Sequence, residues 1–309
     1  MEGEVRNAPY AVREISLART RSGSPYLRLV LWDGSRRVEG RVWDSALAEQ
    51  LAAGLRPGDV VLVGEARWVE YGGDRQLNIS VLRPANAGEY DPGQFRRQRE
   101  GLPAAGEVLS VAGGIGRAHL RELLERLFEP GFLECFVAAP AARENHHCYQ
   151  GGLLQQTLEV VRLCEGMASV FTGLDRDLLL AAALLHDVGK VWEYDAGSVT
   201  FERTDPGKLL GHVVMGWEAV RRVWPEVPGF PEVEGLHLEH MLLSHHGLRE
   251  WGSPVEPSTP EAVALHQADL ASARLHQALE AVSGLAAGAW SVRDGTGRYF
   301  WAGRVPDQE

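Results

Sequence analysis

An uninterrupted run of apolar residues, 178–185, ends abruptly at the adjacent polar pair His186-Asp187. The run is far shorter than the ~20 residues that cross a bilayer, so it predicts a helix buried on all sides within a protein core. A buried polar group without a partner costs on the order of 1–3 kcal/mol, and here two titratable groups stand together. The chain must therefore build a helical core that surrounds this segment and supplies partners for the buried side chains of His186 and Asp187.

Length and composition fit a globular protein of two domains. The chain has 309 residues, of which 45% are hydrophobic and 24% are charged, as is ordinary for soluble proteins. The N-terminal residues contain no apolar core of the kind that a secretory signal requires. The cysteines form no CxxC pair, which argues against a thiolate metal site and for a reducing compartment. We therefore expect a cytoplasmic protein that does not bind membranes.

Charge is distributed unevenly along the chain. The formal net charge of −11 at first argues against a nucleic-acid partner. Residues 1–90, however, hold 12 Arg and 12 acidic residues, so the whole deficit lies in residues 91–309. A neutral, Arg-rich segment is compatible with nucleic-acid binding, and an acidic remainder is compatible with cation binding.

The first segment has the pattern of a small β-barrel. Residues 24–44 (SPYLRLVLWDGSRRVEGRVWD) alternate with a period of two, and Asp33-Gly34 is a strong hairpin signal. A helical stretch, 45–55, precedes two further strand-like segments, 60–71 and 75–83. This order is typical of the five-stranded OB barrel, which we predict for residues 1–88. Another small barrel or sandwich stays open as an alternative.

The rest of the chain is predicted to be helical. Residues 89–115, rich in Pro, Gly and charge, are interpreted as a linker, and residues 116–309 as an all-α bundle. Helical patterns cover 116–128, 151–171, 176–190, 208–224, 234–247 and 260–282, and a small hairpin is expected at 192–202. The predicted fold class is therefore multidomain, with an N-terminal β-barrel followed by an all-α helical bundle.

Histidine and aspartate residues recur at the ends of the apolar helices or along them. One such histidine is usually a satisfied core residue, but a set of imidazoles and carboxylates in one bundle favours a metal site. An adjacent His-Asp pair can direct two donors at neighbouring ions, with the carboxylate as the bridge. The candidate ligands are His186, Asp187, His212, His245, His246 and Asp269.

This arrangement resembles the HD phosphohydrolase superfamily and, more narrowly, the YhaM-type 3′→5′ exoribonucleases. The similarity extends over nearly the whole chain, up to Asp269. Its ordered blocks include GSPYLRLVLWD, PGDVVLVGEARWVEYGGDRQLNI, GGLLQQTLEVV, ALLHDVGK, KLLGHVVMG, MLLSHHGLREWGSP and PEAVALHQADL. The resemblance implies an N-terminal OB domain joined to a C-terminal HD domain, with a Mn²⁺-type metal dependence.

The chain also departs from the family pattern. The family has a metal-binding histidine in a GGLLEHT block, whereas this chain has Gln156 at that position. Three interpretations stay open. The first is coordination by the amide oxygen or compensation by His146 or His147, the second is one weakened metal site with activity retained, and the third is loss of catalysis. Ser272 stands where relatives often have an acidic residue.

Other histidines carry weaker expectations. His146 and His147 precede the glycines of the QGG stretch in a family block and are predicted to line the pocket. His240 matches a family position and is a further candidate ligand. His276 is interpreted as incidental.

The candidate site predicts hydrolysis of a phosphate ester. Two cations a few ångströms apart would hold a water in line with phosphorus and neutralise phosphate oxygens. Asp187 would bridge the cations, and Lys190 would contact a phosphate oxygen or the leaving group. The alternative role of Lys190 is to complement the end of the helix. Mixed nitrogen and oxygen ligands favour Mn²⁺, with Co²⁺ or Fe²⁺ as alternatives, over a structural Zn²⁺.

Aromatic and arginine side chains on the predicted barrel suit single-stranded nucleic acid, which binds by base stacking and phosphate contacts. Loops 19–24 and 70–75 lie where OB folds bind ligands. Alternating aromatics are as often core residues, so Trp32 and Trp43 fit either use. The candidate contacts are Tyr26, Arg28, Arg41, Trp43, Tyr71 and Arg75.

The leading hypothesis is a metal-dependent 3′→5′ exonuclease that hydrolyses single-stranded RNA, with single-stranded DNA as a further candidate substrate. The barrel would guide the strand to the metal site. A phosphohydrolase of small nucleotides is one alternative, although it would not need the barrel. A non-catalytic RNA-binding protein is another, supported by Gln156 alone.

Overall fold

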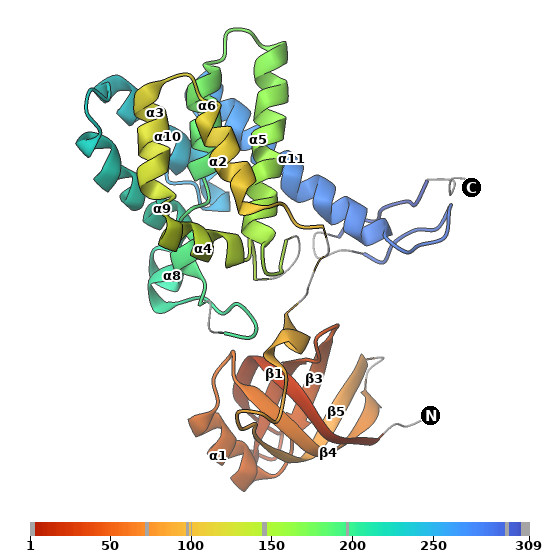
Figure 1. Cartoon of the computed structure of the whole chain (residues 1–309). Helices are drawn as coiled ribbons and strands as arrows, with labels where there is room; N and C mark the ends of the chain where they lie inside the picture. Colours follow the sequence, from red (N-terminus) through yellow and green to blue (C-terminus); the bar gives the residue numbers. More distant parts are fainter. Residues whose placement is uncertain are drawn as a thin grey trace. The chain divides into compact units, whose positions relative to one another are not determined.

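The computed structural model describes residues 4–71, 74–96, 99, 101–143, 147–195, 198–293 and 297–303. The chain divides into two compact units (Figure 1). The first comprises residues 1–100 together with the short segment Tyr194–Arg203, and the second comprises residues 101–193 and 204–309. Each unit has a hydrophobic core of its own.

The first unit is a closed barrel of five strands in the order β1-β2-β3-β5-β4. The strands are β1 (Glu4–Arg19), β2 (Pro25–Trp32), β3 (Arg37–Val42), β4 (Val60–Tyr71) and β5 (Asp74–Pro84). β3 and β5 run parallel, and the other neighbouring strands run antiparallel. Helix α1 (Ser45–Gly54) connects β3 to β4. This is the OB-type arrangement, so the predicted barrel is confirmed.

Alternation along the strands decides which side chains fill the barrel. Leu29 and Leu31 are fully buried inside it, because alternate residues of a strand face the same side. Trp32 is also buried, and its Nε1 donates a hydrogen bond to the backbone oxygen of Phe95 at 3.0 Å. Trp32 therefore packs against the short helix η1 (Pro92–Phe95) and belongs to the core.

The second unit is a bundle of helices. Its elements are α2 (Ala105–Gly113), α3 (Ala118–Leu127), α4 (Pro130–Ala138), α5 (Gly152–Val170), α6 (Arg176–Leu185), α7 (Lys190–Glu193), α8 (Asp205–Leu209), α9 (Gly211–Val223), η2 (Trp224–Glu226), α10 (Glu232–Ser244), η3 (Arg249–Trp251) and α11 (Pro260–Val282). Residues 178–185 of α6 are at most 2% exposed, and this helix contacts α2, α3, α5, α10 and α11. The apolar run therefore forms the buried central helix that the sequence predicts.

The connecting segments differ in detail from the expectations. Helix α2 lies within residues 89–115, the expected linker, and its Val108 and Ala112 are buried in the core of the helical unit. The expected linker therefore contains a core helix, while the domain limits themselves stay a prediction. At the expected hairpin, Tyr194 and Arg203 form an antiparallel bridge. No helix among the described residues combines the length and the hydropathy needed to cross a membrane.

Candidate functional site

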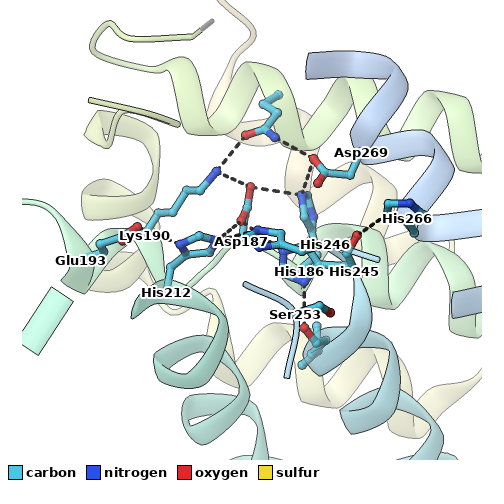
Figure 2. A network of polar contacts seen from close by, with 12 residues as sticks. His186, Asp187, Lys190, Glu193, His212, His245, His246, Ser253, His266 and Asp269 are labelled. Atoms are coloured by element: carbon cyan, nitrogen blue, oxygen red, sulfur yellow. Dashed lines mark hydrogen bonds and ion pairs between the residues drawn. The ribbon is translucent and has the colours of Figure 1, made fainter. Parts of the chain in front are cut away.

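Helix ends, one turn and the middle of a helix bring the predicted ligands together (Figure 2). His186 follows the last residue of α6, and Asp187 lies in the turn before α7. His212 lies in the first turn of α9, and His245 caps the end of α10. Asp269 comes from the middle of α11. Segments far apart in the sequence therefore converge on a single cluster.

Asp187 belongs to one of two neighbouring sets of donor atoms and also contacts the other set. Its Oδ2 is 3.2 Å from Nε2 of His186. Its Oδ1 is 3.3 Å from Nε2 of His212 and 3.7 Å from Nε2 of His245. Within each set the donor atoms lie within 4.8 Å of one another. The first set is His186, Asp187 and Asp269. The second set is His212, His245 and His246. A carboxylate that contacts both sets is placed to bridge two ions.

Several buried atoms of this cluster lack the hydrogen bonds that burial demands. His186 Nε2, His245 Nε2 and Asp187 Oδ1 have no hydrogen-bond partner among the described residues. Ligand atoms bound ~2.1 Å from a tetrahedral ion lie about 3.4 Å apart, close to the 3.2–3.7 Å separations around Asp187. The donor set and its spacing therefore fit divalent cations.

Two imidazoles of the cluster are held in the neutral form that binds cations. Burial lowers the pKa of His212. Burial also lowers the pKa of His246 to about 3, and the neighbouring imidazoles of His245 and His212 add to this effect. A neutral imidazole keeps a lone pair for an ion.

The carboxylates give the cluster a negative field. Burial opposes ionisation of Asp187, but the charges of Lys190 and His186 hold its pKa well below the usual range. Burial likewise lowers the pKa of His186, yet the Asp187 carboxylate outweighs this and the pKa rises to about 10. The raised pKa of His186 shows that the carboxylates of this cluster stabilise a positive charge placed between them.

Neighbouring groups orient the ligands. Glu193, which ends α7, accepts a hydrogen bond from Nδ1 of His212 at 2.8 Å, so that Nε2 faces the cluster. His266 Nδ1 lies 2.8 Å from the backbone oxygen of His245 and supports the end of α10. A Cβ on Gly189 would lie 2.0 Å from the backbone oxygen of His212. Only glycine therefore lets the His-Asp turn approach α9 this closely.

Gln156, on α5, reaches the cluster as the family pattern predicts for this position. Its Nε2 donates to Asp269 Oδ1 at 2.9 Å, and its Oε1 lies 3.4 Å from Lys190 Nζ. Lys190 Nζ also donates to Asp187 Oδ2 at 2.6 Å. The amide thus connects the ammonium of Lys190 with the carboxylate of Asp269.

Two of the histidines named as pocket or ligand candidates, His240 and His147, have partners outside this cluster. His240 Nε2 accepts a hydrogen bond from the backbone N–H of Ser258 at 2.9 Å. His245 is five positions beyond His240, which is about 140° around a helix, so the two side chains diverge. His147 belongs to a different group of donors, with Glu159. His146 lies outside the described residues.

A second candidate surface lies on the barrel. Tyr26 and Trp43 stack with their ring centroids 4.7 Å apart, and the guanidinium of Arg41 lies 5.8 Å from the Tyr26 ring. Trp43 is 46% exposed, and its Nε1 donates to Oδ1 of Asn78. A partly exposed aromatic pair beside a cation can stack bases and contact a phosphate.

The other predicted barrel contacts are only partly placed. Arg28 is exposed and lies 3.5 Å from a carboxylate oxygen of Glu39. The guanidinium of Arg75 lies 5.2 Å from the ring of Trp68, an aromatic residue that was not among the predicted contacts. The side chain of Tyr71 is not among the described ones.

Known proteins resemble this chain over most of its length. Residues 153–274 match the family model described as the HD domain. The 3′-5′ exoribonuclease YhaM of Listeria welshimeri is 33% identical over 261 residues, which are 82% of this chain and 80% of that protein. The protein of the same name from Listeria monocytogenes is 34% identical over 260 residues, 82% of this chain and 80% of that protein. The one from Bacillus licheniformis is 32% identical over 276 residues, 88% of this chain and 86% of that protein.

Proposed function

Because this chain belongs to the YhaM family of 3′-5′ exoribonucleases, we propose that it is a metal-dependent 3′→5′ exonuclease that acts on single-stranded RNA. The observation that carries the proposal is the cluster at the end of α6. Three of its buried donor atoms have no hydrogen-bond partner among the described residues. Polar atoms left in this state mark places where an ion or ligand binds.

The ligand set supports a pair of divalent cations with Asp187 between them. One oxygen of Asp187 faces His212 and the other faces His186. Nitrogen and oxygen donors without thiolate favour Mn²⁺, or else Co²⁺ or Fe²⁺. Cations bound here would supply Lewis-acid polarisation of a phosphate group and would make water a competent nucleophile at neutral pH.

Lys190 is the group of this chain best placed to act on the phosphate. The residue is only 8% exposed, and its Nζ donates to Asp187 Oδ2 at 2.6 Å. The hydrogen bond to Asp187 holds this charge in one place, so little reorganisation is needed when a substrate arrives. Lys190 therefore orients Asp187 and contacts a non-bridging oxygen or the leaving oxygen of the phosphate.

The barrel supports the choice of a single-stranded substrate. Tyr26 and Trp43 would stack bases, and Arg28 and Arg41 would contact phosphates. The balance of 12 Arg and 12 acidic residues in 1–90 predicts modest and salt-sensitive affinity. None of these contacts requires a 2′-hydroxyl, so single-stranded DNA is a second candidate substrate.

One observation favours a second candidate function. The Nε2 atom of Gln156 donates to Asp269, so the amide occupies a carboxylate oxygen that a cation would otherwise bind. An amide that stays in this position would leave a protein that binds RNA without cleaving it. An amide turned by half a rotation offers Oε1 as a neutral ligand and completes the site, and the two orientations have the same shape.

The test is a time course on 5′-labelled single-stranded RNA with Mn²⁺, with Asp187→Ala as the inactive control and Gln156→His as a second variant. A descending ladder from the 3′ end that Asp187→Ala abolishes is the expected result. A ladder from Gln156→His but none from the natural protein would establish an RNA-binding protein whose metal site is catalytically inactive. Absence of hydrolysis by both proteins with Mn²⁺, Co²⁺ or Fe²⁺ would overturn the exonuclease.

A further inference from the structure

A second group of metal-type donors lies in the helical unit, outside the cluster around Asp187. His147, Glu159 and His276 each offer one donor atom, and these atoms lie within 4.8 Å of one another. Nε2 of His147 is 3.2 Å from Oε2 of Glu159, and the imidazoles of His147 and His276 stack with their centroids 3.8 Å apart. The proposed nuclease chemistry uses none of these three side chains.

The backbone places His147 in the interior at a conformational cost. Its φ is 54°, in the left-handed region that side-chain-bearing residues rarely adopt. The residue is nevertheless fully buried, and its backbone oxygen accepts a hydrogen bond from the amide of Ala141 at 3.2 Å. A Cβ on Gly152 would lie 2.0 Å from that oxygen, so the start of α5 is shaped to accept this conformation. Strain that the surroundings enforce is typical of functional positions.

Neutral groups orient the carboxylate of Glu159. Ser272 donates to its Oε2 at 2.8 Å, and Gln155 donates to its Oε1 at 2.8 Å. Tyr149 in turn donates to Oε1 of Gln155 at 2.7 Å. Such an outer layer of hydrogen bonds is what holds carboxylate ligands in metal sites.

The protonation states suit a cation. Burial raises the pKa of Glu159, but hydrogen bonds from His147 and Gln155 outweigh it and lower the pKa to about 2. Burial lowers the pKa of His147. At neutral pH the group therefore contains one ionised carboxylate beside a neutral imidazole.

We propose that His147, Glu159 and His276 bind one Zn²⁺ ion, at a site separate from the His-Asp cluster. Two imidazoles and one carboxylate are a donor set that Zn²⁺ uses, with water in the fourth position. The Irving–Williams order favours Zn²⁺ over Mn²⁺ at nitrogen-rich sites. His276, interpreted from the sequence as incidental, is then a ligand.

This ion would connect the two helices that carry part of the nuclease site. Glu159 is one turn beyond Gln156 on α5, and Ser272 is three residues beyond Asp269 on α11. Hydrogen bonds already join Gln156 to Asp269 and Glu159 to Ser272. Zn²⁺ bound one turn away would fix the spacing of α5 and α11 and so steady Asp269.

The experiment measures Zn²⁺ and Co²⁺ binding to the full chain in an Asp187→Asn background, which removes the bridging carboxylate of the other cluster. We expect this protein to bind one equivalent of Zn²⁺ tightly and to give the visible absorption of four-coordinate Co²⁺. Adding Glu159→Gln, or independently His276→Gln, should abolish that absorption and lower the Zn²⁺ stoichiometry by one. Binding is measured without RNA, so the result does not depend on whether the chain is a nuclease.

A matched control is His119→Gln, because His119 also pairs with a glutamate, Glu234, at 2.9 Å in the same unit. This change should leave the bound Zn²⁺ in place. The Tm of each variant in EDTA reports whether it folds, and Zn²⁺ should raise the Tm of the Asp187→Asn protein but not that of the Glu159→Gln or His276→Gln proteins. Unchanged stoichiometry in both of these variants, or loss of binding in Asp187→Asn alone, would overturn the proposal.

Discussion

Two of the buried carboxylates in the helical unit, Asp187 and Glu239, have different surroundings. Asp187 is 2% exposed, and although Lys190 donates to its Oδ2, its Oδ1 has no hydrogen-bond partner among the described residues. Glu239, on α10, is 6% exposed and accepts hydrogen bonds from three donors, Trp217, Arg221 and Trp224. Burial alone therefore does not distinguish a structural acid from a functional one.

The difference lies in how each carboxylate is satisfied. Glu239 holds helices together because both of its oxygens accept hydrogen bonds, which offsets the cost of burying a charge. Asp187 keeps one oxygen directed at His212 and His245, at 3.3 and 3.7 Å. A buried acceptor without a hydrogen bond lowers the stability of the fold. The same oxygen can bind a cation together with the surrounding imidazoles.

Of the substitutions considered, replacement of Asp187 should reduce catalysis most strongly. Asp187→Asn should lower kcat/KM on single-stranded RNA by at least about 10³-fold, because several kcal/mol of charge stabilisation are lost with the bridging carboxylate. Glu239→Gln should leave kcat/KM unchanged while lowering the unfolding midpoint. Initial rates with Mn²⁺, normalised to folded protein, measure both variants. Similar losses of activity in the two would mean that general destabilisation explains the effect.

The candidate contacts described on the barrel differ from Asp187, because they are exposed or half-buried and have partners within the barrel. Trp43→Ala should weaken binding of single-stranded RNA by about 1–3 kcal/mol, the value of one stacked base, and so raise Kd by roughly 5- to 150-fold. Trp290→Ala, which removes a 65% exposed tryptophan from the other unit, is the control. Equal effects of both substitutions, measured by fluorescence anisotropy, would contradict a specific role for the Tyr26–Trp43 pair.

A smaller effect is expected at Gln156. Gln156→His should tighten Mn²⁺ binding by about tenfold or more, since changes around metal ligands typically alter affinity by 10–100-fold. Calorimetric titration of the metal-free protein measures the change. Gln267→His adds an imidazole at an exposed position of α11 and should have no effect. Tightening by both variants would indicate that added histidine acts non-specifically.

The sequence predicts those parts of the molecule that local periodicity determines. The uninterrupted run 178–185 predicts the buried central helix, and the alternation in 24–44 predicts the strands β2 and β3. Both patterns indicate which faces of a helix or strand are buried in the core. Burial of a face can be predicted without knowing which other elements pack against it. The position of His186 and Asp187 at the end of the buried helix follows directly, because the apolar run ends there.

Contacts between distant elements could not be predicted in the same way. Trp32 and Trp43 both fit the strand pattern, yet the first is 7% exposed and the second 46%. Glu193 gives no sequence signal, because its contact with His212 depends on how α7 and α9 pack. His240 fits a helical pattern that includes His245, but the rotation of α10 directs it to Ser258.

The smallest expected effect concerns pH and the stability of the fold. Burial raises the pKa of Glu239, but hydrogen bonds from Arg221 and Trp217 outweigh it, so the folded pKa lies below the ordinary value of 4.5. A depressed folded pKa stabilises the protein above pH 4.5, and this contribution is lost as the pH falls through the folded pKa. Glu239→Gln should therefore cost about 1 kcal/mol near pH 7, and the difference from the natural protein should shrink below pH 4.5. Urea unfolding of both proteins in EDTA measures the contribution of the Glu239 carboxylate to the free energy of unfolding, because the titration of all other groups affects both proteins equally. A difference that does not change with pH would show that packing around the two indoles, and not the charge, makes Glu239 a structural residue.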